Sequence, residues 1–562
     1  MTTQFFDEVA ATRLAAVSAA LVVSLATTRL YGAEFYNDWA TNHLSSVPSQ
    51  SGPTDDPDSD GTPNLAEYAF GTDPLHSDSI GGAIRPLPPE SNGVFRVEIF
   101  ERAGHRPGVQ IDLDATADLT HWIRPWWLRT LTNSLADDPT NSVRELFTTW
   151  MPDTNIFFVR GVIKLFDAGP EMANYYVATN GSDSASGTAT NVPFRSVHKA
   201  VSVSSAGNLI YVRGGTYATN AVLTIGTSHN GTASNPIRLC AYPGEYPVLD
   251  FSSQTFTSSN DGVKLQASWW QIRGLEIAGA GHNGFHISGN SNVVEQCVVH
   301  DCRDSGIQIS PSGSSNLILN CDSYRNHDPD NYEDADGFAA KDSPPSHIGQ
   351  WNVFHGCRSW ENCDDGWDLW QATNTVVIEN CWSWRNGIDF WGAGTNFNGD
   401  GNGFKLGGNY YPGAHVVVGC VSFGNVQTGF DQNNNAAGLT LDQNTAWANG
   451  ARNFSLNHGT NTTPHLVRNN LSIAGGIADA FRADSILISN SWQVVSPAAS
   501  TNDLLSVDTS FAVAPRRDDG GLPETPFLRP VPGGRLVDKG ADLGAPFSGS
   551  APDLGAFETV AW

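Results

Sequence analysis

The middle of the chain repeats a short pattern in which an aromatic and an apolar residue stand two positions apart. Side chains two apart on a strand share a face, so each copy predicts a short strand with this pair in the core. The residue between them then faces outward, and a glycine precedes the aromatic residue. Copies begin at Asn283, Asp336, Asp365 and Asn402, with looser copies at Ser305, Thr428 and Arg452.

A second pattern alternates with the first and starts at a cysteine or an asparagine. The steps from 297 to 321, from 357 to 381 and from 420 to 444 are each 24 residues. Strand-rich units of this period predict an all-β solenoid whose turns stack about 4.8 Å apart. Equivalent positions then form columns with a structural role: cysteines at 297, 321, 357, 381 and 420, and an asparagine ladder at 326, 362, 386, 425 and 449.

The outward positions of the first pattern carry the candidate chemistry. In the solenoid, Asp336, Asp365 and Asp368 fall on neighbouring turns of one face, with Asp364 beside them and Lys405 one turn along. Four carboxylates this close repel one another unless a cation lies among them. Hard oxygen ligands at flexible spacing favour Ca²⁺. The alternative is a solvated acidic face with no ligand.

Charge limits the partners. The 562 residues carry a formal net charge of −27, and the pI is about 4.7. This excess of negative charge argues against nucleic acid and anionic membranes as partners. It does not exclude an acidic polymer, because bound calcium reverses the field locally.

Residues 1–33 are predicted to be a secretory signal. Arg13 precedes an apolar run from Leu14 to Ala26 that is too short to cross a bilayer. No later apolar run is long enough either. We therefore expect a secreted, extracellular protein. A periplasmic or cell-surface location is the alternative for an exported chain.

Residues 34–81 contain a loop that matches the calcium-binding template D-x-D-x-D-G-x₅-E. Its predicted ligands are Asp56, Asp58, Asp60 and Glu67. It resembles the calcium repeats of EF-hand-like dockerins and of thrombospondin type 3 modules. This predicts a structural calcium site, and a plain acidic linker is the alternative.

Residues 82–168 are β-patterned and predict a small β-sandwich-like accessory module. Trp122, Trp126 and Trp127 would either stack on sugar rings or pack inside that module. Residues 169–562 form the predicted solenoid, with a capping helix expected within 193–204. The eight cysteines are expected to be reduced core thiols, although export leaves disulfides through Cys302 or Cys363 open.

Four segments in order resemble the core motifs of polysaccharide lyase family 9, whose members are right-handed parallel β-helix pectate lyases. They are Asp334-Ala-Asp336-Gly-Phe-Ala-Ala-Lys, Asp364-Asp365-Gly-Trp-Asp368-Leu, Asn402-Gly-Phe-Lys405-Leu-Gly-Gly-Asn and Gly429-Phe-Asp431-Gln-Asn-Asn-Asn. The resemblance covers roughly residues 174 to 560. It implies that Asp336, Asp364, Asp365 and Asp368 bind calcium and that Lys405 is the catalytic base.

β-Elimination on a uronic acid fits this set of residues. It requires a base for the proton next to the carboxylate and a positive charge to stabilise the enolate-like intermediate. Lys341 is the rival base, and a structural salt bridge is the alternative role of Lys405. Asn402, Asp431, Arg452 and His415 are candidates for binding substrate.

Several functions remain open from the sequence. The favoured one is a calcium-dependent lyase acting on an acidic plant or algal polysaccharide such as polygalacturonate. A lyase of the same type acting on rhamnogalacturonan or from chain ends is the second. The third is an inverting glycoside hydrolase, which would need paired carboxylates spaced for a water molecule. A non-catalytic carbohydrate-binding solenoid is the least favoured function. A monomer is expected.

Overall fold

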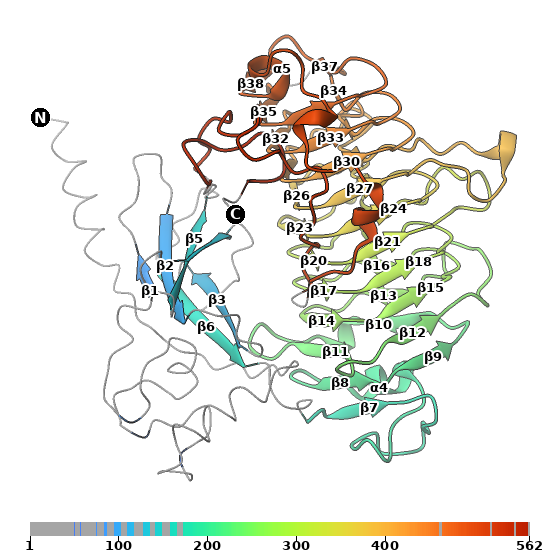
Figure 1. Cartoon of the computed structure of the whole chain (residues 1–562). Coiled ribbons are helices and arrows are strands. Elements are labelled where there is room, and N and C mark those ends of the chain that lie inside the picture. Colours follow the sequence, from blue (N-terminus) through green and yellow to red (C-terminus); the bar gives the residue numbers. More distant parts are fainter. Residues whose placement is uncertain are drawn as a thin grey trace, which may run out of the picture. The chain divides into compact units, whose positions relative to one another are not determined.

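The computed structural model describes residues 172–459, 463–517, 520–544 and 547–559, the strands β1 to β6, and the single residues 50, 57 and 75 (Figure 1). The chain divides into two units, Met1–Met172 with Leu543–Pro546, and Ala173–Asp542 with Phe547–Trp562. Several predictions lie outside the described residues: the signal at 1–33, the tryptophans at 122, 126 and 127, and the calcium ligands Asp56, Asp58, Asp60 and Glu67.

The first unit contains two antiparallel sheets. One has the order β1-β2-β5-β4, and β3 pairs with β6 in the other. The β-pattern of residues 82–168 thus corresponds to strands, and their sandwich-like arrangement stays a prediction. The bounds are β1 Ile84–Pro86, β2 Phe95–Arg102, β3 Val109–Thr116, β4 Leu128–Ser134, β5 Asn141–Thr148 and β6 Phe158–Leu165.

The second unit is a parallel β-helix built from three parallel sheets, as the 24-residue repeat predicts (Figure 1). Each turn of the chain adds one strand to each sheet, so residues of successive turns stand side by side. The first sheet, which carries the candidate site, has ten strands: β10 Leu223–Ile225, β13 Val263–Leu265, β16 Phe285–Ile287, β19 Ile307–Ile309, β22 Phe338–Ala340, β25 Trp367–Asp368, β28 Phe404–Lys405, β31 Phe430–Asp431, β34 Phe454–Leu456 and β37 Ala480–Phe481.

The other two sheets complete each turn. The second sheet has twelve strands: β7 Tyr175–Val177, β8 Leu209–Val212, β11 Ile237–Ala241, β14 Trp270–Arg273, β17 Val293–Glu295, β20 Leu317–Leu319, β23 Asn352–His355, β26 Val376–Glu379, β29 Val416–Val418, β32 Thr440–Asp442, β35 Leu466–Arg468 and β38 Ile486–Ile488. The third sheet has ten: β9 Gly215–Ala218, β12 Pro247–Asp250, β15 Glu276–Ala278, β18 Val298–His300, β21 Asp322–Tyr324, β24 Arg358–Trp360, β27 Trp382–Trp384, β30 Val421–Phe423, β33 Thr445–Trp447 and β36 Leu471–Ile473.

The aromatic residues of the first pattern form a continuous stack in the core. Phe338, Trp367, Phe404, Phe430 and Phe454 are all buried. Their ring centroids follow one another at 4.7, 4.7, 4.8 and 5.0 Å. This spacing equals the distance between strands. The stack therefore fixes the register of the outward residues that lie next to it.

The asparagine ladder is also present. The Asn362 backbone N–H and Nδ2 donate to Asn386 Oδ1 at 3.1 and 3.0 Å, and Asn386 donates to Asn425 Oδ1 in the same way at 3.1 and 2.9 Å. All of these side chains are buried. The ladder thus satisfies polar groups at a buried corner of the solenoid.

The cysteines pack as predicted. All eight are free thiols, and the five of the column are fully buried. The Cys321, Cys357, Cys381 and Cys420 Sγ atoms each donate to a backbone carbonyl of the preceding turn at 3.4 to 3.6 Å. The alternative of a disulfide through Cys302 or Cys363 is not found.

One segment covers the first turns of the stack, and another covers part of its third sheet. The helix α4 (Val197–Val203) packs Val197, Ala200 and Val201 onto the first turns, which confirms the predicted capping helix. After α5 (Ser491–Val494), the C-terminal segment lays Phe527, Leu528 and Leu554 over the third sheet. The short 3₁₀ turns are η2 Thr227–His229, η3 Gly394–Asn396, η4 Thr501–Asp503 and η5 Thr509–Val513. In the described part of the chain, no helix combines the length and apolar character needed to span a membrane.

Candidate active site

The first sheet brings the outward residues of the repeat into register. Ala339 pairs with Asp368, Asp368 with Lys405, and Lys405 with Asp431. Because the strands are parallel and in register, these side chains line up along the axis of the solenoid. The columns predicted from the repeat are therefore present as neighbouring side chains.

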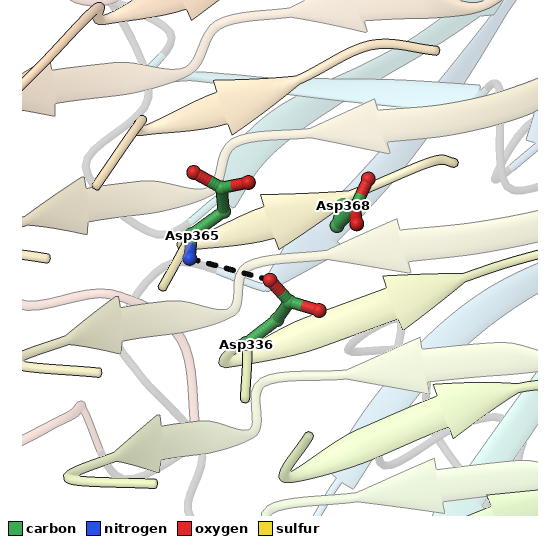
Figure 2. Close-up of side chains that lie close together, drawn as sticks. All are labelled: Asp336, Asp365 and Asp368. Atoms are coloured by element: carbon green, nitrogen blue, oxygen red, sulfur yellow. Dashed lines mark hydrogen bonds between the residues drawn. The ribbon is translucent and has the colours of Figure 1, made fainter. Parts of the chain in front are cut away.

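Three carboxylates meet at the start of these strands. Figure 2 shows Asp336 just before β22, and Asp365 and Asp368 at β25. One oxygen of each lies within 4.8 Å of the others, and all three residues are buried. The Asp365 backbone N–H donates to Asp336 Oδ1 at 3.2 Å, which fixes the first two carboxylates relative to each other.

A second group of carboxylates adjoins the first and includes a residue that the sequence did not single out. Asp364, Asp365 and Asp400 also have oxygens within 4.8 Å of one another. The Asp400 backbone N–H donates to Asp364 Oδ1 at 2.5 Å, and the Asp400 side chain is 58% exposed. Asp400 belongs to an inserted loop outside the repeat, so the periodicity of the repeat does not predict its position. Its position two residues before the Asn402 motif was the only available signal.

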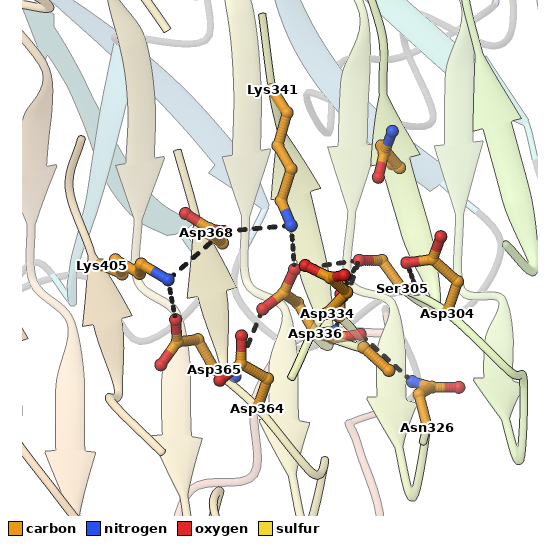
Figure 3. A network of polar contacts seen from close by, with 12 residues as sticks. Asp304, Ser305, Asn326, Asp334, Asp336, Lys341, Asp364, Asp365, Asp368 and Lys405 are labelled. Atoms are coloured by element: carbon orange, nitrogen blue, oxygen red, sulfur yellow. Dashed lines mark hydrogen bonds and ion pairs between the residues drawn. The ribbon is translucent and has the colours of Figure 1, made fainter. Parts of the chain in front are cut away.

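Two lysines reach into this cluster, as Figure 3 shows. Lys405 Nζ lies 3.1 Å from Asp365 Oδ2, 3.2 Å from Asp400 Oδ2 and 3.7 Å from Asp368 Oδ2. Lys341 Nζ lies 2.8 Å from Asp336 Oδ2 and 3.0 Å from Asp368 Oδ2. Asp368 is thus shared between the two lysines, with Lys405 contacting three carboxylates and Lys341 two.

Burial and mutual repulsion control the ionisation of this cluster. Burial, followed by the charge of Asp365, raises the pKa of Asp364 well above its usual range, and burial raises the pKa of Asp365 to about 6. Burial would lower the pKa of Lys405, but the surrounding carboxylates, Asp365 foremost, raise it above the ordinary lysine value. The same balance raises the pKa of Lys341, through Asp336 and Asp368. Without further cations, the cluster therefore keeps both lysines charged.

The carboxylates fit a divalent cation. Asp368 Oδ1 is buried and accepts no hydrogen bond from the described residues, so it remains a vacant oxygen ligand. All the converging donors are carboxylate oxygens, with no cysteine or histidine in either group, and this is the ligand type that calcium prefers. Asp336, Asp364, Asp365 and Asp368 are the residues that would hold the ion.

Three of the four predicted substrate-binding residues lie on the same sheet. Asp431 follows Lys405 on the next turn, and its Oδ1 is buried without a hydrogen bond among the described residues. Asn402 is largely engaged in structure, since its N–H donates to Asp365 Oδ1 at 2.6 Å and its Oδ1 accepts from the Thr428 N–H at 3.1 Å. Arg452 lies two residues before β34, and its Nε is buried without a described partner.

His415 is placed elsewhere. It directly precedes β29 in the second sheet, it is fully buried, and its Nδ1 accepts the Val376 backbone N–H at 3.1 Å. Burial lowers its pKa to about 4. A fully buried side chain has no surface to offer a polymer, so the structure contradicts the expected contact between His415 and substrate.

Comparisons with known proteins agree with this fold. Residues 175–470 match the family described as "Pel9A-like, right handed beta helix region". The chain is 41% identical over 395 residues to pectate lyase L of Dickeya chrysanthemi, a match that covers 68% of this chain and 90% of the relative.

Two solved structures are also similar. The crystal structure of pectate lyase Pel9A superposes with a TM-score of 0.64 at 39% identity, over 68% of this chain and 96% of that one. A structure named rhamnogalacturonan lyase superposes with a TM-score of 0.58 at 28% identity, over 64% of this chain and 96% of that one.

Proposed function

Since the chain belongs to the Pel9A-like family of right-handed parallel β-helix polysaccharide lyases, we propose that it is a calcium-dependent pectate lyase. It cleaves polygalacturonate by β-elimination, and Lys405 is the base. The observation that carries the proposal is the position of Lys405, in register with Asp368 and within 4 Å of three carboxylates.

In this reaction, Lys405 removes a proton from the substrate. Its Nζ takes the proton from carbon 5 of the uronate, next to the carboxylate. The electron pair released at carbon 5 forms a double bond to carbon 4. The bond from carbon 4 to the glycosidic oxygen breaks, and that oxygen leaves with its electron pair and takes a proton from water. Positioned general bases contribute about 10²–10⁴-fold to such steps.

The aspartates act in this proton transfer by binding the cation. Asp336, Asp364, Asp365 and Asp368 bind calcium, which would supply the positive charge that stabilises negative charge developing on the substrate carboxylate. The Lys405 side chain is 9% exposed, so it has little contact with bulk water. This arrangement holds the amine at one place beside the ligand set.

The protonation state of Lys405 sets the working pH. The base must be neutral, whereas the carboxylates around it raise its pKa. A bound divalent cation acts in the opposite direction, because it repels the ammonium form. Activity is therefore expected to increase with pH into the alkaline range.

A second substrate has an observation in its favour. The 28% identity to a structure named rhamnogalacturonan lyase leaves the mixed backbone as a candidate for the same chemistry. Product analysis separates the two. Polygalacturonate gives unsaturated oligogalacturonides, whereas rhamnogalacturonan gives unsaturated products that also contain rhamnose.

We also propose that the protein is exported and acts as a monomer. The apolar run from Leu14 to Ala26 supports export, and a site built within one sheet needs no second chain. N-terminal sequencing of the protein in culture medium tests export. Light scattering measures the mass of the particle in solution and so tests whether the protein is a monomer.

The experiment that tests the function is a substrate panel with ultraviolet detection of the conjugated alkene. Polygalacturonate, methyl-esterified pectin and rhamnogalacturonan are each incubated with the full chain, with calcium and with a chelator. Alkene formed from polygalacturonate only with calcium supports the proposal. Alkene from rhamnogalacturonan alone changes the substrate, and reducing ends without alkene contradict elimination.

A further inference from the structure

A charged corner belongs to the same turns as the carboxylate–lysine cluster and is not used by the reaction above. Arg325, Glu361 and Arg385 each follow a strand of the third sheet, and the pairings of Tyr324 with Trp360 and of Trp360 with Trp384 place them on successive turns. The Arg325 and Arg385 side chains are 52% and 46% exposed. Two exposed guanidinium groups in one column stand out in a chain with a net charge of −27.

Glu361 holds the two guanidinium groups in place through one nitrogen each. Arg325 Nε donates to Glu361 Oε2 at 3.0 Å, and Arg385 Nε donates to Glu361 Oε1 at 3.1 Å. Both carboxylate oxygens are thereby used. The Nη nitrogens of the two arginines have no hydrogen-bonding partner in the described part of the chain. These are the nitrogens with which a guanidinium binds a carboxylate in the bidentate manner.

An exposed aromatic ring lies between these two groups. The Phe390 ring centroid is 5.6 Å from the Arg325 Cζ and 5.5 Å from the Arg385 Cζ, and Phe390 is 37% exposed. Trp391 packs edge-on against it at 6.1 Å. The corner therefore combines a flat apolar surface with two cationic groups, which suits a sugar ring that carries a carboxylate.

The loop that presents Phe390 is held firmly. Asp389 accepts the backbone N–H groups of Trp391, Gly392, Ala393 and Gly394 at 2.7 to 3.1 Å. His327 stacks on Trp391 with the ring centroids 4.8 Å apart. A loop fixed in this way presents its aromatic ring without a large loss of conformational entropy on binding.

The sequence at this corner is costly in conformational energy. Arg325, Glu361 and Arg385 have positive φ angles of 55°, 56° and 56°, a conformation that Asp301, Gly424 and Ala448 share at the equivalent positions of other turns. Glycine adopts this conformation without strain, whereas other residues are disfavoured in it. An exposed ion pair contributes little to the stability of the folded state. Stability alone therefore gives little reason for charged side chains at these positions.

The corner belongs to the same turns as the cluster. Arg325 precedes Asp336, Glu361 precedes Asp365, and Arg385 precedes Lys405, each within one turn of the solenoid. Glu361 and Asp365 are four residues apart in sequence, so their Cα atoms are at most about 14 Å apart. A chain of sugars that occupies the cluster can therefore also reach the corner.

We propose that Arg325, Arg385 and Phe390 form an accessory subsite that binds the carboxylates of an acidic polysaccharide chain next to the cluster. This inference rests on the proposed function for the identity of the chain. The subsite itself is independent of the chemical step, because it concerns only the binding of the chain. The subsite gives a polyanion a local positive field on an otherwise acidic protein.

The test measures binding in a variant that lacks the base. Full-length Lys405→Ala is titrated calorimetrically with oligogalacturonate hexamer in the presence of a chelator. The same titration is carried out with two further variants. One combines Lys405→Ala with Arg325→Gln and Arg385→Gln, and the other combines Lys405→Ala with Phe390→Ala. We expect the dissociation constant to rise about tenfold for the arginine pair and about threefold for Phe390→Ala. In the Lys405 enzyme, the arginine pair is expected to raise KM on polygalacturonate by a similar factor with kcat unchanged.

Arg213 provides the matched control. It also pairs with a glutamate, Glu245, and lies over an aromatic ring, Tyr242, with its Cζ 4.3 Å from the centroid, but it belongs to the opening turns. Arg213→Gln is expected to leave hexamer binding unchanged. Equal hexamer affinity of the arginine pair and its parent, with melting temperature and calcium affinity unchanged, would overturn the subsite. A failure of the proposed function is recognised separately, as the absence of alkene in the substrate panel.

Discussion

Asp368 and Lys405 lie opposite each other on neighbouring turns of the first sheet, with Lys405 Nζ 3.7 Å from Asp368 Oδ2. The parallel register produces this relationship directly, because each residue occupies the outward position of its own repeat. A carboxylate that binds calcium and an amine that removes a proton must be neighbours in the proposed reaction. In this fold, two adjacent copies of one sequence pattern provide both.

The first prediction concerns calcium affinity. Asp365→Asn removes a buried ligand common to both carboxylate groups, and calcium affinity is expected to fall at least about tenfold. Isothermal titration calorimetry measures it. Asp442→Asn is the control, since Asp442 is a largely buried carboxylate paired with Arg468 on the second sheet. An equal loss of affinity in both variants would show that the effect is general destabilisation.

A second prediction concerns Asp400. Its carboxylate lies 3.2 Å from Lys405 Nζ and stabilises the ammonium form. Asp400→Asn is therefore expected to lower the pKa of Lys405, so that the alkaline rise of kcat/KM moves to lower pH. The measurement is the pH–rate profile of both enzymes at saturating calcium. A profile that stays in place, or moves to higher pH, would contradict the assignment of Lys405 as the titrating base.

A third prediction concerns stability and pH at a histidine outside the site. His282 Nδ1 lies 2.9 Å from Asp261 Oδ1, and its Nε2 lies 2.6 Å from Asp304 Oδ2. Burial opposes its charge, but the two carboxylates outweigh this and raise the pKa of His282 to about 9. The unfolded value is about 6.5.

The sign of this effect follows from the raised pKa. The charged histidine stabilises the folded state fully below about pH 6.5, and the contribution disappears as pH rises through about 9. His282→Asn is therefore expected to lower the melting temperature at pH 6.5 more than at pH 9.5. Thermal denaturation at both values, with calcium fixed, measures the difference. An equal decrease at the two values would contradict the assigned charge.

The fourth prediction concerns the asparagine ladder. Asn386→Ala removes the acceptor of the Asn362 backbone N–H, which is left buried without a partner, while Asn362 Nδ2 keeps its bond to Ser359 Oγ. The free energy of unfolding is expected to fall by about 1–3 kcal/mol for each group left unsatisfied. Urea denaturation measures the change. Asn290→Ala is the comparison, because Asn290 is an exposed asparagine that accepts the Ser314 N–H at 2.9 Å, and it should have a much smaller effect.

Much of the solenoid was predictable because its repeat leaves few choices. An aromatic residue and an apolar residue two apart, repeated every turn, determine which side chains face outward. The column of Ala339, Asp368, Lys405 and Asp431 follows from that periodicity alone, and the structure confirms it. The cysteine column was predictable for the same reason, and the capping helix was predictable because a solenoid needs its end covered.

The residues that were missed lie in loops, where no period applies. Asp400 and Phe390 belong to the insertion between 386 and 402, and the fold of that insertion depends on contacts such as the one from Asn398 N–H to Asn331 O at 3.1 Å. His415 was misplaced for a related reason. It directly precedes a strand of the second sheet and accepts the Val376 N–H there, and a position in the repeat does not reveal which corner of a turn a residue occupies.

The most direct test of the account is the rate of alkene formation on polygalacturonate by the wild type, Lys405→Ala and Lys341→Ala, each with calcium and with a chelator. We expect the wild type to form alkene only with calcium. Lys405→Ala should be slower by about 10²–10⁴-fold while its calcium affinity persists, and Lys341→Ala should retain more activity than Lys405→Ala. Wild-type activity in Lys405→Ala, or its loss only in Lys341→Ala, would contradict the assignment of Lys405 as the base.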